Sequence, residues 1–324
     1  MIVIKIKTIQ NRFSNIHEKL FQTMNALQAY EKDIALQLDF LKSFRVQKPL
    51  SQNQQKNTIF TGSGDSLVSA MLAESFSNGV ISAMDPLDLY KNKQLVKSKH
   101  VYFISISGNT ISNIKVVKAA KKAIAITSKS RSRLANVSYK TILLVAPNSD
   151  VFTAGSISFL ESALTCISLV KKIKISRTRE LFSNARADAK KAKLSKRVFV
   201  LGNFFTFPLA MYCAAKFYEI LGYDAHYVKL EQFSHMELFA IKKNDTVIIF
   251  EEKNSHNIQL EQNLKKIGVN VIHPLIPSEK ISQIIYCTFF SQLITLFEAK
   301  KKNKKNCHFF TAKKIRKISN EMIY

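Results

Sequence analysis

From Asn57 onward, short apolar segments alternate with helical segments, and this alternation constrains the fold more than any other feature of the sequence. Parallel sheets covered by helices on both faces produce such a pattern, so we predict an α/β protein. In the first half, the pattern predicts strands at 57–61, 79–83, 101–105, 122–126 and 140–145, and helices at 66–77, 111–121, 130–135 and 155–172. In the second half, it predicts strands at 197–202, 245–250 and 269–274, and helices at 206–221, 257–267 and 279–300. Because the same alternation begins again at residue 197, the sequence indicates a weak internal duplication.

The flanking segments complete the expected organisation of the 324 residues, a length typical of two domains. Residues 8–45 show helical periodicity through Phe13, Ile16, Leu20, Met24 and Leu27, and a polar linker follows at 47–57. A polar, basic helix is expected at roughly 177–194, and the basic tail has helical character at 311–322. We therefore expect a helical segment at 1–48, domains at 49–176 and 177–300, and a tail at 301–324.

Charge and cysteine content narrow the functional classes. The 49 Lys and Arg against 23 Asp and Glu give a net charge of +26, which favours anionic ligands. No nucleic-acid motif accompanies this charge, so we expect a solvated basic surface rather than a nucleic-acid partner. No run approaches the roughly 18 apolar residues of a membrane span, and no secretory signal is evident. The four scattered cysteines predict reduced, mostly buried thiols and a cytoplasmic protein.

Two loops carry the candidate ligand-binding residues. The stretch "NTIFTGSGDS" reads as a strand, a glycine turn and a helix N-terminus, an arrangement that holds anions. It lacks the third glycine of a dinucleotide fingerprint, because Leu67 stands there. A second loop, "FISISGNTISN", brings Ser105, Ser107 and Thr110 to the end of another strand. Either loop alone is also compatible with an ordinary capped turn. Two hydroxyl-rich loops at the carboxyl edge of one sheet predict a phosphate-monoester site.

The motifs "TGSGDS", "ISISGNT" with "AIAITSKSRSRLANVSY", and "AAKFYEIL" followed by "FSH" resemble the sugar isomerase (SIS) family of phosphosugar-binding proteins. The resemblance covers roughly residues 50 to 300. It is closest in layout to archaeal phosphoglucose/phosphomannose isomerases and to the isomerase domain of glucosamine-6-phosphate synthase. It implies two tandem SIS domains, each a parallel five-stranded sheet flanked by helices in a flavodoxin-like, three-layer arrangement. It also implies phosphosugar binding at Gly64, Ser66 and the second-loop hydroxyls.

The resemblance implies catalytic residues in the second half. In related enzymes a glutamate moves the proton between C1 and C2, and a histidine sixteen residues later, from the neighbouring subunit, helps to open the ring. Glu219 and His235 have this spacing, and Lys216 matches a synthase-type Lys-x-x-Glu motif. A glutamate of raised pKa and a histidine suit proton shuttling and ring opening. Each residue taken alone is more often structural.

Several positions depart from the related enzymes. The phosphoglucose/phosphomannose isomerases carry a Pro-Arg pair where this chain has "LLVAPNSDVFTAGS", with Thr153 about where the arginine would fall. Asp150 matches an acidic residue of the synthase-type loop. The tail offers Lys313, Lys314 and Lys317 as candidates for a C-terminal lysine.

Asp65 stands where related proteins mostly carry Gly, Ser or Thr. A carboxylate aimed at a phosphate dianion would weaken binding, so we expect it to cap the helix that starts at Ser66. The alternative is that Asp65 accepts hydrogen bonds from sugar hydroxyls.

Together these features predict a homodimeric phosphosugar aldose–ketose isomerase, which interconverts fructose 6-phosphate with glucose, mannose or glucosamine 6-phosphate. We expect no cofactor, no metal and no membrane partner, and His235 reaching across the dimer interface. The alternatives are a non-catalytic SIS protein that senses phosphosugars and, from charge alone, a polyanion-binding protein.

Overall fold

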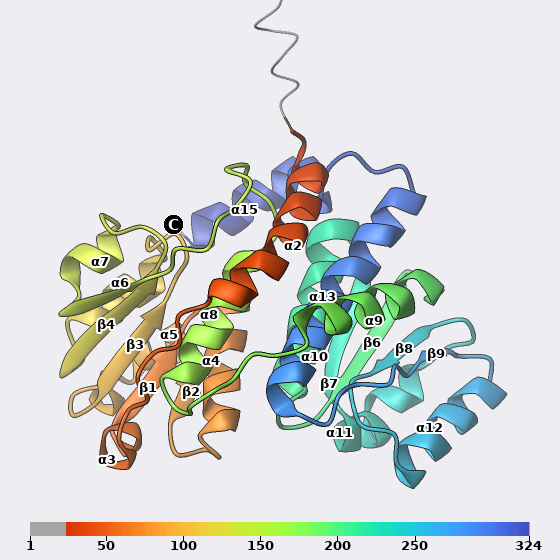
Figure 1. Ribbon diagram of the computed structural model, residues 1–324, viewed down its shortest axis with the longest axis horizontal. Coiled ribbons are helices and arrows are strands. Elements are labelled where there is room, and N and C mark those ends of the chain that lie inside the picture. The colour runs from red at the N-terminus through yellow and green to blue at the C-terminus, as the bar shows by residue number, and fades with distance from the viewer. Residues whose placement is uncertain (1–23, 324) are drawn as a thin grey trace, which may run out of the picture.

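The computed structural model describes residues 24–323 and contains two parallel sheets with helices between and around them (Figure 1). The expected helical positions Phe13, Ile16 and Leu20 lie outside the described residues. The remainder of that segment forms α2 (Ala26–Ser43), which Asn25 caps through a capping box with Gln28. The linker after α2 includes one short helix, α3 (Gln52–Lys56).

The first sheet has five parallel strands in the order β2-β1-β3-β4-β5. Its strands are β1 (Thr58–Thr61), β2 (Ser82–Met84), β3 (His100–Ile104), β4 (Lys122–Thr127) and β5 (Lys140–Leu143). Its helices are α4 (Asp65–Phe76), α5 (Pro86–Lys91), α6 (Ile111–Val117), α7 (Arg133–Val137) and α8 (Ile157–Ser168). β1 is fully buried, and β3 is buried after its first residue, as expected of central strands covered on both faces. All the predicted strands and helices of this half are present, with shifted ends.

The second sheet has four parallel strands in the order β7-β6-β8-β9, one fewer than the resemblance implied. Its strands are β6 (Arg197–Gly202), β7 (Asp224–Lys229), β8 (Thr246–Ile249) and β9 (Asn270–Ile272). Its helices are α10 (Phe207–Lys216), α11 (Leu230–His235), α12 (Ser255–Lys266) and α13 (Lys280–Lys301). After β9 the chain enters α13 instead of a fifth strand. The pattern analysis missed β7, which is an edge strand with buried and exposed positions interleaved.

The helices between the two sheets share one hydrophobic core (Figure 1). It contains Phe60 of β1, Leu164 of α8, Tyr212 of α10 and Phe290 of α13, so both halves contribute to it. α9 (Thr178–Lys191), the predicted basic helix, packs on α13. Separate clusters lie under the outer helices of each sheet.

α13 is the one helix in residues 24–323 that is long and apolar enough to cross a membrane by length and composition. Its most apolar window is 94% buried within the protein, which is the environment of a core helix. All four cysteines are free and buried, as predicted.

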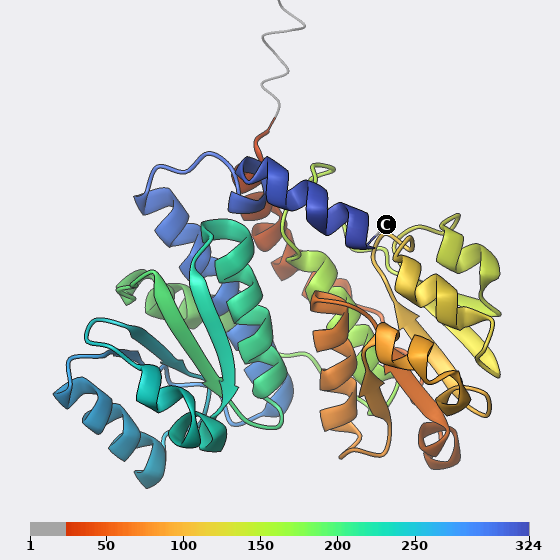
Figure 2. The same cartoon turned by 180° about the vertical axis from the view of Figure 1, so that it is seen from behind.

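The tail forms α14 (His308–Thr311) and α15 (Lys313–Ile323). α14 packs on the segment that follows α10, and the Arg316 guanidinium of α15 lies 4.7 Å from the centre of the Phe310 ring. Figure 2 shows α15 crossing from the second half toward the first.

Candidate active site

The carboxyl ends of β1 and β3 form the first crevice, defined by residues 62–66 and 105–110. The chain leaves β1 toward β2 on one side and β3 lies on the other, so this is the point at which strand order reverses and where open α/β sheets bind ligands. Gly62 allows the close approach of the two loops. A Cβ there would lie 2.6 Å from Ser66 Cβ and 2.9 Å from the Ile104 carbonyl oxygen.

The predicted hydroxyl groups meet at this crevice, and part of their hydrogen-bonding capacity is used locally. Ser105 Oγ lies 3.0 Å from Thr110 Oγ1 and accepts from the Gly108 N–H at 3.1 Å. Ser107 Oγ accepts from the Asn109 N–H at 3.3 Å. The Ser66 hydroxyl makes no hydrogen bond to another described residue. Ser66 and Ser107 therefore keep O–H donors for a ligand.

Asp65 does not cap α4, contrary to the expectation from sequence. Gly64 occupies the N-cap position with φ 58°, and no side chain bonds to the free N–H groups of the helix. Asp65 is the first helical residue, and its Oδ2 accepts from Lys216 Nζ at 2.8 Å. An ammonium group is a stronger partner for a carboxylate than neutral N–H groups are. Asp65 Oδ1 is buried and has no partner among the described residues.

Lys216 joins the first crevice to the predicted catalytic glutamate. Its side chain is fully buried at the end of α10, and its Nζ contacts both Asp65 Oδ2 and, at 2.5 Å, Glu219 Oε2. Glu219 lies on a π-helical turn, Phe217–Leu221, that continues α10. Such turns occur frequently at functional sites. The structure thus brings three predicted residues together, although 151 positions separate Asp65 from Lys216.

The electrostatics of this cluster favour a carboxylate that can exchange a proton. Desolvation by surrounding protein atoms raises the pKa of Glu219 above its ordinary 4.5; the Lys216 ammonium opposes this shift, and the Asp65 carboxylate adds to it. The Glu219 side chain still keeps an exposed fraction of 36%, so part of it remains accessible to a ligand. Burial alone would lower the pKa of Lys216, but Asp65 and Glu219 outweigh burial and leave that pKa raised. Lys216 is therefore a fixed cation.

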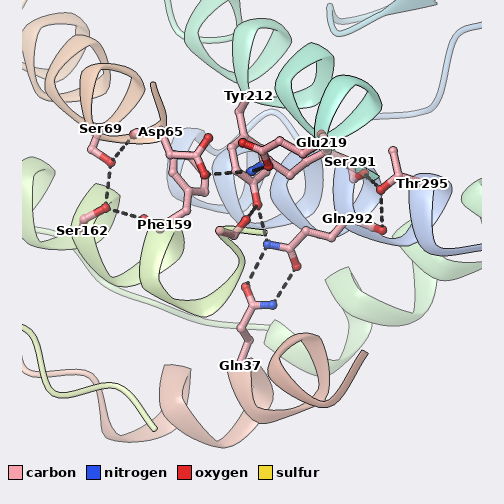
Figure 3. A network of polar contacts seen from close by, with 12 residues as sticks. Gln37, Asp65, Ser69, Phe159, Ser162, Tyr212, Glu219, Ser291, Gln292 and Thr295 are labelled. Atoms are coloured by element: carbon pink, nitrogen blue, oxygen red, sulfur yellow. Dashed lines mark hydrogen bonds and ion pairs between the residues drawn. The ribbon is translucent and has the colours of Figure 1, made fainter. Parts of the chain in front are cut away.

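A buried polar network, in which Tyr212, Gln292 and Gln37 follow one another, lies beside the cluster (Figure 3). The Lys216 ammonium lies 4.8 Å from the centre of the Tyr212 ring, and Tyr212 Oη donates to the Gly155 carbonyl at 2.8 Å. Gln292 Nε2 donates to Tyr212 Oη at 2.9 Å, and Gln292 in turn pairs with Gln37 of α2. Sequence reasoning missed Tyr212, Gln292 and Gln37. Their only signal was a polar residue inside an otherwise apolar helical run.

His235 and Asp150 lie apart from this cluster within the chain. His235 ends α11, has a side chain that is 68% exposed, and lies 3.1 Å from Glu231. Asp150 is exposed, adopts φ 59°, and has an N–H that bonds to Asn148. Thr153 Oγ1 donates to the Ala26 carbonyl at 2.8 Å, so its hydroxyl is used to hold α2.

The candidate tail lysines are exposed on α15. Lys317 lies 3.9 Å from Glu321 of the same helix, and neither Lys313 nor Lys314 makes an ion pair with a described residue. Within residues 24–323, no group of three or more His, Cys, Asp and Glu side chains could hold a metal ion.

Solved structures share this architecture over most of their length. A glucosamine-6-phosphate deaminase from Thermotoga maritima superposes with TM-score 0.69 at 18% identity, covering 85% of this chain and 95% of its own. The C-terminal domain of a glucosamine-fructose-6-phosphate aminotransferase from Francisella tularensis gives TM-score 0.64 at 14% identity, covering 86% and 96%. The tagatose-6-phosphate ketose/aldose isomerase from Escherichia coli gives TM-score 0.58 at 16% identity, covering 84% of this chain and 90% of its own.

These similarities establish the fold class, an SIS-type, Rossmann-like α/β architecture. No protein-family model matches the sequence, and no curated protein matches it.

Proposed function

We propose that this chain is a phosphosugar isomerase that interconverts aldose and ketose 6-phosphates through an enediol or enediolamine intermediate. The observation that carries the proposal is the direct link from the first crevice through Asp65 and Lys216 to Glu219. It connects a carboxylate of raised pKa to the helix start beside the hydroxyl groups that we propose bind phosphate. The names of the solved structures with this fold, which include a deaminase and a ketose/aldose isomerase, support the same class of substrate.

Glu219 is the proposed proton shuttle. Lys216 donates to its Oε2, while Oε1 accepts no hydrogen bond from another described residue and is free to take a proton. The carboxylate removes the proton from the carbon next to the carbonyl and returns it to the neighbouring carbon. A raised pKa brings its proton affinity closer to neutral pH, which improves its efficiency as acid and base. Lys216 stays protonated and orients Oε2.

The phosphate is proposed to bind the Ser66 and Ser107 hydroxyls and the free N–H groups at the start of α4, next to Ser105 and Thr110. We further propose that His235 opens the sugar ring from a second copy in a cytoplasmic homodimer. Its high exposure at the end of α11 makes it accessible to such a copy.

A substrate panel with a single-residue variant tests the assignment. Glucose, mannose, fructose and glucosamine 6-phosphates are incubated with the protein, with and without ammonia, and products are followed by NMR. We expect conversion of at least one of them, and a loss of about 100-fold or more in turnover for Glu219→Gln. Glu180→Gln, which alters an exposed ion pair with Arg177, is the matched control. A Glu219→Gln variant that keeps turnover within about threefold would remove the shuttle assignment.

The second candidate function is phosphosugar sensing without turnover. It is favoured by Thr153, which stands about where an arginine is expected and whose hydroxyl bonds to the Ala26 carbonyl instead. In that case the same panel gives thermal stabilisation by one sugar phosphate and no product with any of them.

A further inference from the structure

The second sheet has a crevice of its own, lined by residues 203–206 and 251–254 and by the first turns of α13. It lies at the carboxyl ends of β6 and β8, where the strand order reverses again. A cavity of about 290 Å³ opens there, close to the lower end of small-molecule pockets. Its lining comes from residues 203–206, from Glu251, Glu252 and Asn254, and from Lys280 and Gln283 of α13.

A carboxylate of the chain itself already takes the position of an anion in this second crevice. Glu251 Oε1 accepts from the Asn203 N–H at 2.8 Å and from the Thr206 hydroxyl, at the start of α10. These are the donors that a phosphate would use there. A phosphate would also meet the negative charge of Glu251. The second crevice is therefore not a second phosphate site.

Gln283, one of the residues that line the cavity, has a buried acceptor that lacks a donor among the described residues. Gln283 is 2% exposed, and its Oε1 has no hydrogen-bond partner in the described chain. Its Nε2 donates to Glu252 Oε1 at 3.3 Å, and the reverse amide orientation would set oxygen against a carboxylate. Gln283 therefore presents an oxygen that needs a donor, and an unsatisfied buried acceptor is costly.

The remaining lining favours a positive charge. The two carboxylates, Glu251 and Glu252, face the single cation Lys280, in a chain whose net charge is +26. The Lys280 ammonium lies 3.3 Å from Glu252 and 5.4 Å from the centre of the Phe205 ring, so an ammonium is already stabilised in this environment.

Phe204 offers a further aromatic surface beside the cavity. Its side chain is 52% exposed and its φ is 35°, a strained conformation for a bulky residue. The hydrogen bond from Ser75 Oγ of α4 to the Phe204 carbonyl holds it there. The side-chain NH₂ groups of Asn203 and Asn254 donate to no described residue and remain available for hydroxyl oxygens.

We propose that the second crevice binds a small polyhydroxylated primary amine without a phosphate, such as an amino sugar. Its ammonium donates to Gln283 Oε1 and Glu252 beside the Phe204 ring, and its hydroxyls meet the amides of Asn203 and Asn254. This site is separate from the first crevice and does not depend on the isomerase activity proposed there.

Binding of glucosamine to the full chain, measured by calorimetry slightly below neutral pH, tests the proposal. Glucose and N-acetylglucosamine are matched probes that lack the charge. We expect glucosamine to bind about tenfold or more tightly than either, since a hydrogen bond to a charged group is stronger than one to a neutral group. Gln283→Leu and Glu252→Gln should each weaken glucosamine binding about five- to tenfold.

Gln283→Leu removes an unsatisfied buried acceptor, so the variant should fold at least as stably as the parent chain. Ser107→Asp, which alters only the first crevice, should leave glucosamine affinity unchanged. The proposal is overturned if glucose binds as tightly as glucosamine, if Gln283→Leu has no effect, or if Ser107→Asp abolishes glucosamine binding. Absence of any glucosamine binding at millimolar concentration overturns it as well.

Discussion

The two crevices of this molecule share a backbone plan and differ in which groups occupy it. Gly62 directly follows β1 and Gly202 is the last residue of β6, and each lies against the residue four positions on, Ser66 and Thr206. In the first crevice the Ser66 hydroxyl is free of described partners. In the second, the Thr206 hydroxyl and the Asn203 N–H both bond to Glu251.

Under the two proposals, the two crevices have different ligand preferences although their backbone plan is shared. A single carboxylate after β8 converts an anion site into one that favours a cation. The first crevice also carries a carboxylate, Asp65, yet the Lys216 ammonium pairs with it and offsets its charge. Both crevices have a helix start at the carboxyl edge of a parallel sheet. They differ in what their acidic side chains contact: Asp65 pairs with Lys216, whereas Glu251 accepts from the loop and helix donors.

The largest expected effect is on the free energy of unfolding, and it distinguishes Lys216 from Lys280. Lys216→Met should lower the free energy of unfolding by about 3 kcal/mol, because it leaves Asp65 without its cation. Lys280→Met should cost less than about 1 kcal/mol, because its pair with Glu252 is exposed. Urea denaturation of both variants measures the difference. Adding Asp65→Asn to Lys216→Met should recover part of the loss, and equal costs for the two lysines would contradict this account of the first crevice.

The sequence predicted every strand of both sheets except one edge strand, β7. β6 is found at its predicted limits, because a fully buried parallel strand is a continuous apolar run. β7 was missed because an edge strand interleaves polar residues such as His226 with buried ones. The prediction of five strands in the second sheet was wrong, since α13 takes the place of a further strand.

The candidate site was predicted in its residue types but not in its contacts. Glu219 and Lys216 were named from the resemblance to SIS enzymes, and the structure brings them together. The Asp65–Lys216 pair was not foreseen, because no local pattern links residues 151 positions apart. The predicted Asp65 cap was wrong because Asp65 pairs with this distant lysine. A buried ammonium competes more strongly for a carboxylate than helix N–H groups do. The roles of His235 and Asp150 remain predictions.

A smaller effect should follow from introducing a carboxylate into the first crevice, in imitation of Glu251. Ser107→Asp can keep the hydrogen bond from the Asn109 N–H but adds a negative charge where phosphate is proposed to bind. Affinity for the sugar phosphate that binds the parent chain should fall about 30-fold or more, because like charges in contact cost several kcal/mol. Ser107→Asn, which adds a similar side chain without charge, is the matched control. Equal affinities of the two variants, measured by calorimetry, would show that the anion binds elsewhere.

The smallest effect tests whether Asp65 acts on Glu219 through charge. The Asp65 carboxylate raises the pKa of Glu219, so Asp65→Asn should lower that pKa. A general base must be ionised, and kcat/KM of the proposed isomerase falls on the acid side as Glu219 takes up its proton. The acid limb of the pH profile should therefore move to lower pH in Asp65→Asn and stay in place in Asp39→Asn, which alters an exposed pair with Lys42. An acid limb that moves to higher pH would contradict this expectation. It would mean that Asp65 acts chiefly by holding the Lys216 ammonium near Glu219, because an ammonium that moved away would no longer favour the ionised form of Glu219.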